Sequence, residues 1–510
     1  MRRKNLYLIG LIASMTALAA CSSSSSGTGS TASTAGTANE AVSTSDSEAS
    51  LENSDSSADN ETDNNTGSDK PEGTPPDGTP PDGEGGPGGN PPDGNPPDGS
   101  GGGPGGNTSS SFEYSGATEI VSADSQSAQT YSSDETDVSA LIINTDEDVT
   151  ISEATVTKTG DSDGGDNCNF YGLNAAVLVM GGSTTTITGA NITSDADGAN
   201  GVFSYGGNGG QNGAAGDGTT VIISDSTITT TGDGSGGIMT TGGGITKASN
   251  LTVTTNGRSS AAIRTDRGGG TVTVDGGSYT TNGLGSPAIY STADITVSKA
   301  DLTSNLSEGV CIEGMNSITL NNCNMTANNT QMNGNATFLD TIMIYQSMSG
   351  DADSGTSSFT MNGGSLTSKN GHVFHVTNTH AVITLNSVEI TNEDDDGILL
   401  SVCDDGWSGA DNVAELYAVD QTLAGGILVG DDSTLTLSLS NSDFTGYISG
   451  EITNAKGDTV SENTGTVNVI LSDESTWTLT ADSYITSFDG DTDNIIGNGY
   501  TVYVNGTAIN

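Results

Sequence analysis

The chain has 510 residues, among them 73 Gly and 12 Pro, and a formal net charge of -52. Leu, Lys and Arg are too scarce for an ordinary helical or doubly wound α/β domain. Only 12 Lys and Arg residues stand against 64 Asp and Glu residues. This imbalance makes nucleic acids a very poor candidate partner and disfavours direct binding to anionic membrane surfaces, because both attract basic proteins.

The first twenty residues have the order of an export signal. MRRKNLYLIGLIASMTALAA starts with three basic residues, continues with an apolar stretch and ends in small residues. The apolar stretch is too short for a stable membrane span. With the next residue it forms LAAC at 18–21, which resembles the lipobox of bacterial lipoproteins. The resemblance implies that residues 1–20 are removed and that a lipid on Cys21 anchors the chain, while plain secretion is the alternative.

Residues 21–112 form a polar segment with almost no apolar side chains to bury. The segment contains Ser-rich runs and the stretch KPEGTPPDGTPPDGEGGPGGNPPDGNPPDGSGGGPGG. Such a composition does not form a core, and the Pro-Pro-Asp-Gly units favour extended polyproline II interrupted by flexible glycines. We therefore expect a disordered spacer that holds the following domain away from the membrane.

Residues 113–510 repeat one short phrase, of which TVTVDGGSYTTNG at 271–283 is an example. Two alternating apolar residues precede a turn of about four residues, and another apolar residue follows it. This alternation indicates strands, and the region contains only one proline, Pro287. The copies are Val149/Ile151/Val156, Thr185/Ile187/Ile192, Val221/Ile223/Ile228, Val272/Val274/Tyr279, Ile295/Val297/Leu302, Ile318/Leu320/Met325, Phe359/Met361/Leu366, Ile383/Leu385/Ile390, Leu416/Ala418/Leu423, Leu437/Leu439/Phe444 and Trp477/Leu479/Tyr484, with a degenerate copy at 246–251.

A third apolar strand lies between successive copies of this phrase. It recurs about every 25 residues, which is the range of solenoid repeats. Three short strands per repeat, stacked about 4.8 Å apart, predict an all-β fold, a single parallel β-helix of about 11–12 rungs. The third strands begin at Val177, Val202, Ile238, Ile263, Ile289, Val310, Ile342, Val373, Ile398 and Ile427.

A threonine follows the apolar residue after most of the turns. We expect these threonines to form a column outside the stack, because β-branched side chains suit a pleated surface. They are Thr157, Thr193, Thr229, Thr252, Thr280, Thr303, Thr326, Thr367, Thr391 and Thr445.

The repeat and the closing segments STWTLTADSYITSF and IIGNGYTVYVNG resemble right-handed parallel β-helix proteins. This superfamily includes pectate lyases, polygalacturonases and bacterial surface adhesins. The resemblance covers residues 113–510 and implies a right-handed coil, and the closing segments are most similar to adhesin-type solenoids. The fold alone does not choose between enzyme and adhesin, because one fold carries many functions.

Neither enzyme class of this superfamily finds an ordered catalytic set in the sequence. A polygalacturonase-like hydrolase needs paired carboxylates with a His and a basic residue. NGH at 370–372 and DDDG at 394–397 are the nearest match, but their order is reversed and no Arg follows Arg267. A lyase uses an Arg or Lys base together with calcium, and only Arg264 and Arg267 form a close arginine pair, with Asp266 between them. We assign no catalytic residue.

The sequence assigns no metal or other cofactor either. His372, His375 and His380 lie in GHVFHVTNTH, where residues three apart on a strand face opposite sides and do not share a metal. The acidic loops DSDGGD, DADG and DGDTDN lack a full calcium-loop pattern, so solvated turns are expected and weak calcium binding is the alternative. The disulfide state stays open for the cysteines beyond Cys21, which are Cys168, Cys311, Cys323 and Cys403.

The third strand supplies the candidate binding surface. If its first apolar residue points inward, the next residue points outward and forms a mostly apolar outer stripe. Such stripes usually bind a ligand, and arginine and aromatic side chains suit sugar rings. Burial of the stripe under the insertions at 207–218 and 326–337 is the alternative. The candidate ligand-binding residues are Phe203, Arg264, Arg267, Tyr290 and Phe374.

Signal, spacer and β-helix together predict a lipid-anchored protein on the extracellular face of a bacterial membrane. The expected function is binding of a cell-surface or extracellular polysaccharide, or of a host protein, in the manner of an adhesin. A polysaccharide lyase or glycoside hydrolase and a passive structural rod are the two alternatives.

Overall fold

Strands make up most of the part of the chain that the structure describes. The computed structural model describes residues 113–510 except 163 and 209–214, all within one unit of the chain. In this part there is one α-helix, α1 (Asp166–Tyr171), and one short 3-10 helix, η1 (Thr492–Asn494). The predicted all-β class is confirmed. The predicted export signal, Cys21 and the spacer lie outside the described residues.

Most strands belong to two large sheets whose neighbouring strands run parallel. The twenty-stranded sheet contains β3 (Asp124–Ser127), β4 (Thr130–Ser133), β7 (Val149–Ser152), β8 (Thr155–Lys158), β10 (Thr184–Thr188), β11 (Asn191–Ser194), β13 (Thr220–Ser224), β14 (Thr227–Thr230), β16 (Gly244–Thr255), β18 (Gly270–Thr281), β20 (Asp294–Ser298), β21 (Asp301–Ser304), β23 (Ser317–Ala327), β25 (Thr356–Ser368), β27 (His380–Asn386), β28 (Glu389–Asn392), β30 (Asn412–Val419), β32 (Ser433–Ser440), β36 (Thr466–Leu471) and β39 (Ser487–Asp489).

The fifteen-stranded sheet contains β2 (Glu119–Ile120), β6 (Leu141–Asn144), β9 (Val177–Met180), β12 (Val202–Tyr205), β15 (Ile238–Thr241), β17 (Ile263–Thr265), β19 (Ile289–Ser291), β22 (Val310–Glu313), β24 (Asp340–Tyr345), β26 (His372–Thr377), β29 (Ile398–Val402), β31 (Thr422–Val429), β33 (Asp443–Ser449), β37 (Thr476–Leu479) and β40 (Ile495–Ile496). Three small sheets pair β1 (Ser115–Gly116) with β5 (Val138–Ser139), β34 (Ile452–Thr453) with β35 (Thr459–Ser461), and β38 (Ser483–Ile485), β41 (Val502–Val504) and β42 (Thr507–Ala508) with one another.

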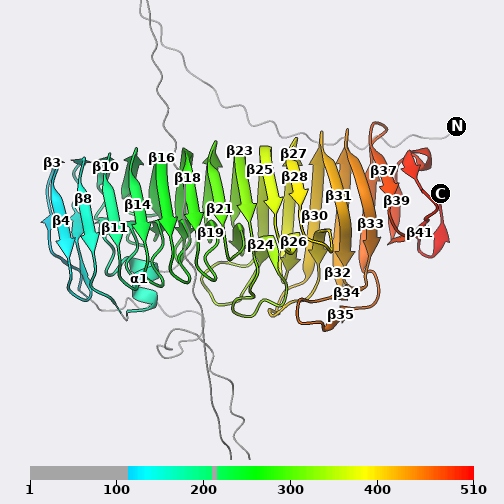
Figure 1. The fold of residues 1–510 in the computed structure, drawn as a ribbon, viewed down its shortest axis with the longest axis horizontal. Helices are drawn as coiled ribbons and strands as arrows, with labels where there is room; N and C mark the ends of the chain where they lie inside the picture. The colour runs from blue at the N-terminus through cyan, green and yellow to red at the C-terminus, as the bar shows by residue number, and fades with distance from the viewer. Residues whose placement is uncertain (1–112, 163, 209–214) are drawn as a thin grey trace, which may run out of the picture. The chain divides into compact units, whose positions relative to one another are not determined.

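The chain passes from one large sheet to the other and back in each repeat. After β18 it forms β19 in the fifteen-stranded sheet and then returns as β20 and β21. Each strand pairs with its counterpart in the next repeat, as β18 does with β20 and β21, and β19 with β22. Figure 1 shows the strands standing side by side in chain order from β3 to β41.

The register of β18 explains the repeated phrase. Val272, Val274 and Tyr279 are buried and lie opposite apolar residues of β20 and β21. The turn between them needs glycine: Gly277 has a φ of 99°, and a Cβ there would lie 2.4 Å from the carbonyl oxygen of Leu251. The phrase therefore encodes two inward-facing strands joined by a bend with no room for a side chain.

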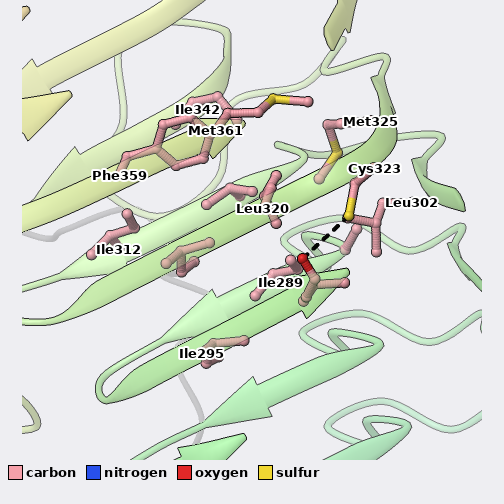
Figure 2. Close-up of a cluster of buried hydrophobic side chains, with 14 of the residues drawn as sticks. Ile289, Ile295, Leu302, Ile312, Leu320, Cys323, Met325, Ile342, Phe359 and Met361 are labelled. Carbon is pink, nitrogen blue, oxygen red and sulfur yellow. Dashed lines mark hydrogen bonds between the residues drawn. The ribbon is translucent and has the colours of Figure 1, made fainter. Parts of the chain in front are cut away.

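The inward side chains of both sheets form one continuous hydrophobic cluster. Ile289 from the fifteen-stranded sheet and Ile295 and Leu302 from the twenty-stranded sheet are all fully buried, and Figure 2 shows them with their neighbours from the following repeats. The Cys323 thiol lies among them, 3.4 Å from the carbonyl oxygen of Val297. Each repeat thus buries its apolar residues mainly against the repeats next to it.

The predicted threonine column is present with two corrections. Thr280 lies opposite Thr303 and opposite Thr254, so Thr254 occupies the place predicted for Thr252. In this degenerate copy Leu251 and Val253 are both buried. The threonine after either one therefore fitted the pattern, and the prediction took Thr252. Thr445 belongs to β33 in the fifteen-stranded sheet and is outside the column.

The last repeats are built differently from the prediction. From β30 onward, the strand after the turn belongs to the fifteen-stranded sheet, as β31 and β33 do. Trp477 accordingly lies opposite Phe444, and Tyr484, predicted to face inward, is 47% exposed. The three-strand pattern therefore ends before the C-terminus.

Four insertions flank strands of the fifteen-stranded sheet. They are residues 159–176 with α1, residues 328–339, residues 346–355 and residues 403–411. Each of them brings at least one side chain onto the outer face of this sheet, as the contacts below show.

Candidate ligand-binding face

One residue from each successive strand of the fifteen-stranded sheet forms an outward-facing ladder, called the outer ladder here. Strand pairing places its members directly opposite one another, which agrees with the third-strand prediction over most of its length. The members are Leu178, Phe203, Met239, Arg264, Tyr290, Cys311, Met343, His375, Ser401 and Leu428.

Phe374 does not belong to the outer ladder, contrary to the prediction. Its partner across the strands is Ile342, and its side chain is fully buried in the main core against Phe359. In HVFHV both Val373 and Phe374 are apolar, so the sequence offered two registers, and the structure places His375 outside. Phe374 is therefore a core residue and is removed from the binding candidates.

Phe203 occupies the outer ladder but is covered. Its side chain is fully buried in a small cluster with Leu178 and Met239, and a Cβ on Gly172, just after α1, would lie within 3 Å of its ring. The insertion that contains α1 covers it. The N-terminal part of the ladder is therefore a second core, not a binding surface.

Arg264 is the first charged member of the outer ladder. Its guanidinium lies 2.6 Å from Asp266, with side chains 14% and 3% exposed, respectively, and 5.4 Å from the ring centre of Tyr290. Burial lowers the pKa of Arg264, but Asp266 and Tyr290 outweigh burial and raise it overall. Burial raises the pKa of Asp266 to about 6 despite the opposing effect of the guanidinium. Arg264 therefore stays positively charged and does not act as a proton acceptor.

Arg267 joins the sheet to two insertions. Its Nη2 and Nε atoms lie 2.6 Å and 3.1 Å from the same carboxylate oxygen of Asp351. Its guanidinium lies 4.1 Å from the ring centre of Phe170 on α1. Arg267 and Asp351 are only half-buried, so this ion pair is accessible from outside.

Glu313 is the hydrogen-bonding centre of the same face. It is 2% exposed, and one carboxylate oxygen accepts from Tyr290 at 2.5 Å and from Tyr345 at 3.1 Å. The other oxygen accepts from the hydroxyls of Ser347 and Ser349. Burial and the nearby Glu313 raise the pKa of both tyrosines well above the usual value, so the phenols stay protonated and donate.

These contacts continue into one network. The Ser349 hydroxyl also lies 3.0 Å from a carboxylate oxygen of Asp351, so it stands between Glu313 and the Arg267 ion pair. The Tyr345 ring lies 4.9 Å from the half-buried Trp407 ring. We call this network the arginine–aromatic cluster. It consists of Phe170, Arg264, Asp266, Arg267, Tyr290, Glu313, Tyr345, Ser349, Asp351 and Trp407.

The histidines of β26 form a second, deeper cluster on the same face. His372 and His375 each place Nδ1 2.7 Å from the Ser401 hydroxyl, and the Phe338 ring lies 4.6 Å from that of His375. His375 Nε2 lies 3.4 Å from Asp405. The expectation that His372 and His375 face apart is wrong, because both side chains reach the same hydroxyl.

The side chains of Ser401, His375 and Asp405 are of the types that form a Ser-His-Asp nucleophilic triad. They are buried, so a substrate has no access to them. Ser401 and His375 are fully buried, as is the carboxylate of Asp405. Asp405 is tied to the insertion at 328–339 by the amide and hydroxyl of Thr337, at 2.7 Å and 2.6 Å, and Phe338 covers the imidazole. In this arrangement the group holds insertions in place.

No protein family, no curated protein and no solved structure matches this chain. Within residues 113–510, apart from the gaps, no helix is long and apolar enough to span a membrane. The inference of function therefore depends on the geometry of the outer face.

The two hydrolase-like segments of the sequence lie in contact. The Gly371 amide donates to Asp394 at 2.8 Å, which brings NGH and DDDG into contact. Burial, with a contribution from His375, lowers the pKa of His372 to about 3. An imidazole with that pKa carries no proton near neutral pH, so His372 does not act as a general acid there.

The described residues contain no group of three or more His, Cys, Asp or Glu side chains that could hold a metal ion. His380 lies apart from the other histidines and bonds Glu415 at 2.9 Å. In the loop 489–494, Asp491 instead accepts from the amide of Asp493 and caps η1. The cysteines in this part, Cys168, Cys311, Cys323 and Cys403, are buried, and the last three are free thiols.

The sequence pointed to Arg264, Arg267 and Tyr290, which the structure brings together, but missed most of their partners. Asp351 and Trp407 come from insertions with no repeat pattern, and Glu313 lies at the end of β22. The available signal was length: the insertions at 346–355 and 403–411 interrupt an otherwise short repeat, and functional side chains concentrate on such loops.

Proposed function

We propose that this chain is an extracellular, lipid-anchored protein whose body is a right-handed parallel β-helix that binds carbohydrate. Parallel, in-register pairing of each strand with the next repeat supports the β-helix. Connections between parallel strands of one sheet are right-handed in about 98% of cases, which favours the right-handed coil. The pectate-lyase-like superfamily has this architecture.

The anchoring part of the proposal depends on the N-terminal sequence. Residues 1–20 have the order of an export signal, and LAAC at 18–21 offers Cys21 for lipidation. The Pro-Pro-Asp-Gly segment up to residue 112 supplies reach, because polyproline II extends about 3.1 Å per residue. Together these features hold a binding domain outside the cell membrane.

One observation carries the binding function: a continuous network joins two half-buried rings, Tyr345 and Trp407, to the accessible Arg267–Asp351 ion pair. Sugar rings bind by stacking their C–H faces on aromatic side chains while fixed polar groups bind the hydroxyls. The network offers both on one face. A host protein is the alternative ligand for the same surface.

Catalysis is less well supported than binding. Both arginines of the cluster are ion-paired, so neither is a free base for a lyase. The Ser401 hydroxyl is buried, and the pKa of His372 is too low for proton transfer near neutrality. A lyase or hydrolase would need a rearrangement of this face, and a passive rod would need no such face at all.

Glycan binding by the full-length chain tests the proposal. We expect binding on a glycan array, and we expect Trp407→Ala to weaken it by about tenfold or more, because aromatic anchors commonly contribute at least 1–2 kcal/mol. Tyr500→Ala, at a 43% exposed position far along the chain, is the matched control and should bind normally.

Three outcomes contradict the proposal. Unsaturated uronate or new reducing ends from pectin would make the chain an enzyme. Binding to host proteins but to no glycan would make it a protein-binding adhesin. Absence of any binding would leave the passive rod.

A further inference from the structure

We propose that the glycan bound at the arginine–aromatic cluster carries positive charge, as an amino-sugar polymer with free amines does. This inference rests on the proposed carbohydrate-binding function and specifies the ligand class. The same geometry disfavours uronate-rich polymers, which two neighbouring arginines would ordinarily suggest.

The first step is that both guanidiniums already have a carboxylate partner. Arg264 already has Asp266 at 2.6 Å and is nearly buried. Arg267 already directs two of its N–H groups to one oxygen of Asp351. A uronate would have to share an arginine with a protein carboxylate, and the two like charges would then lie close together.

The second step is the charge balance of the face. Asp266, Glu313 and Asp351 belong to the cluster, and the exposed Asp166 lies at the first position of α1, beside Phe170 and Arg267. Four carboxylates against two guanidiniums leave a net charge of two negative units when all are ionised. The whole chain adds a background of -52, which repels polyanions and attracts polycations.

The third step is the chemistry of the half-buried rings. The faces of Trp and Tyr attract cations, and a nearby carboxylate reinforces this attraction. Two rings of the cluster already hold cations, Phe170 under Arg267 at 4.1 Å and Tyr290 under Arg264 at 5.4 Å. Tyr345 and Trp407 are half-buried and in contact with each other, so they offer the same kind of surface to a sugar ammonium.

The test compares three oligosaccharides of equal length by calorimetry with the full-length chain: a glucosamine oligomer, its N-acetylated form and a galacturonate oligomer. We expect the glucosamine oligomer to bind about tenfold more tightly than the N-acetylated form, and the galacturonate oligomer to bind weakest. Raising the salt concentration from about 0.05 M to 0.3 M should weaken glucosamine binding only, because screening acts on charge pairs.

Charge-removing variants locate the effect. Asp166→Asn should weaken glucosamine binding about threefold to tenfold and leave binding of the N-acetylated form unchanged. Glu474→Gln removes the same charge from an exposed turn between β36 and β37 and should change neither affinity. A lysine decapeptide serves as a cationic ligand without sugar rings.

The outcomes separate this inference from the proposed function. Tightest binding of the galacturonate or N-acetylated oligomer would overturn the inference and leave carbohydrate binding intact. Equal binding of the glucosamine oligomer and the lysine decapeptide, with no effect of Asp166→Asn, would also overturn the inference. It would mean that the acidic chain attracts any polycation. Failure of all three oligosaccharides to bind would overturn the proposed function itself.

Discussion

His372 is held as a neutral imidazole by its surroundings. Its Nδ1 lies 2.7 Å from the Ser401 hydroxyl, and the Phe338 ring lies 5.4 Å away on one side. Burial is the main cause that lowers its pKa from the ordinary 6.5 to about 3, and the neighbouring His375 adds to the effect. The folded protein therefore rejects a proton that the unfolded chain accepts.

This difference gives a pH dependence with a definite sign. Between pH 6.5 and pH 3 the unfolded chain binds one more proton at His372 than the folded chain does, so stability is complete above 6.5 and falls as the pH falls. The slope is about 1.4 kcal/mol per pH unit. As the pH falls from 6.5 to 4.5, the free energy of unfolding should decrease in the original chain. In His372→Gln we expect this decrease to be about 2–3 kcal/mol smaller, as measured by urea unfolding at each pH. Parallel losses in both proteins would contradict the assignment.

At the scale of the element, the bend inside β18 determines how two strands of a repeat meet. Gly277 has a φ of 99°, and a Cβ there would lie 2.4 Å from a backbone oxygen of β16. Gly364, in the corresponding bend of β25, has a φ of 81° and a similarly close backbone contact of 2.0 Å. The bend therefore needs both a left-handed backbone and the absence of a side chain.

A pair of variants separates these two requirements. Gly277→Ala should cost about 3–4 kcal/mol, because backbone strain of about 1–3 kcal/mol adds to a clash with an atom that strand pairing fixes. Gly457 has a φ of 86° with nothing within 4 Å of an added Cβ, so Gly457→Ala should cost only the strain, about 1 kcal/mol. The loss of unfolding free energy is measured by chemical unfolding. Equal losses in the two variants would contradict the prediction, because they would mean that the backbone shifts to avoid the clash with β16.

The elements differ in how well the sequence could predict them. The alternating triplets predicted the strands of the twenty-stranded sheet because their inward positions are consistently apolar, as at Val272 and Val274. Where two neighbouring residues are both apolar, as at Val373 and Phe374, periodicity allowed two registers and the wrong one was chosen. The insertions that supply Asp351 and Trp407 have no period at all, so only tertiary contacts place them.

At the scale of the whole molecule, charge repulsion opposes folding. The chain carries a net charge of -52, and few of its carboxylates have basic partners, as only 12 Lys and Arg residues are present. Like charges close together destabilise a folded state through self-repulsion. The parallel strands nevertheless place acidic turns of successive repeats next to one another, as with Asp197 and Asp233.

Salt should therefore stabilise the protein. Raising NaCl from about 0.01 M to 0.3 M shortens the Debye length from roughly 30 Å to below 8 Å, so we expect the melting temperature to rise by several degrees in calorimetry. An unchanged or lower melting temperature at the higher salt concentration would mean that repulsion between the carboxylates does not limit stability.

The outer ladder also has an evolutionary consequence. Its polar members Arg264, Tyr290, His375 and Ser401 come from the stretch of strands from β17 to β29, and strand pairing fixes their spacing. Duplication or deletion of a repeat near either terminus would lengthen or shorten the stack without changing the distance between Arg264 and Tyr290. Relatives of very different length would then share one recognition surface, and sequence drift in the terminal repeats would not affect what they recognise.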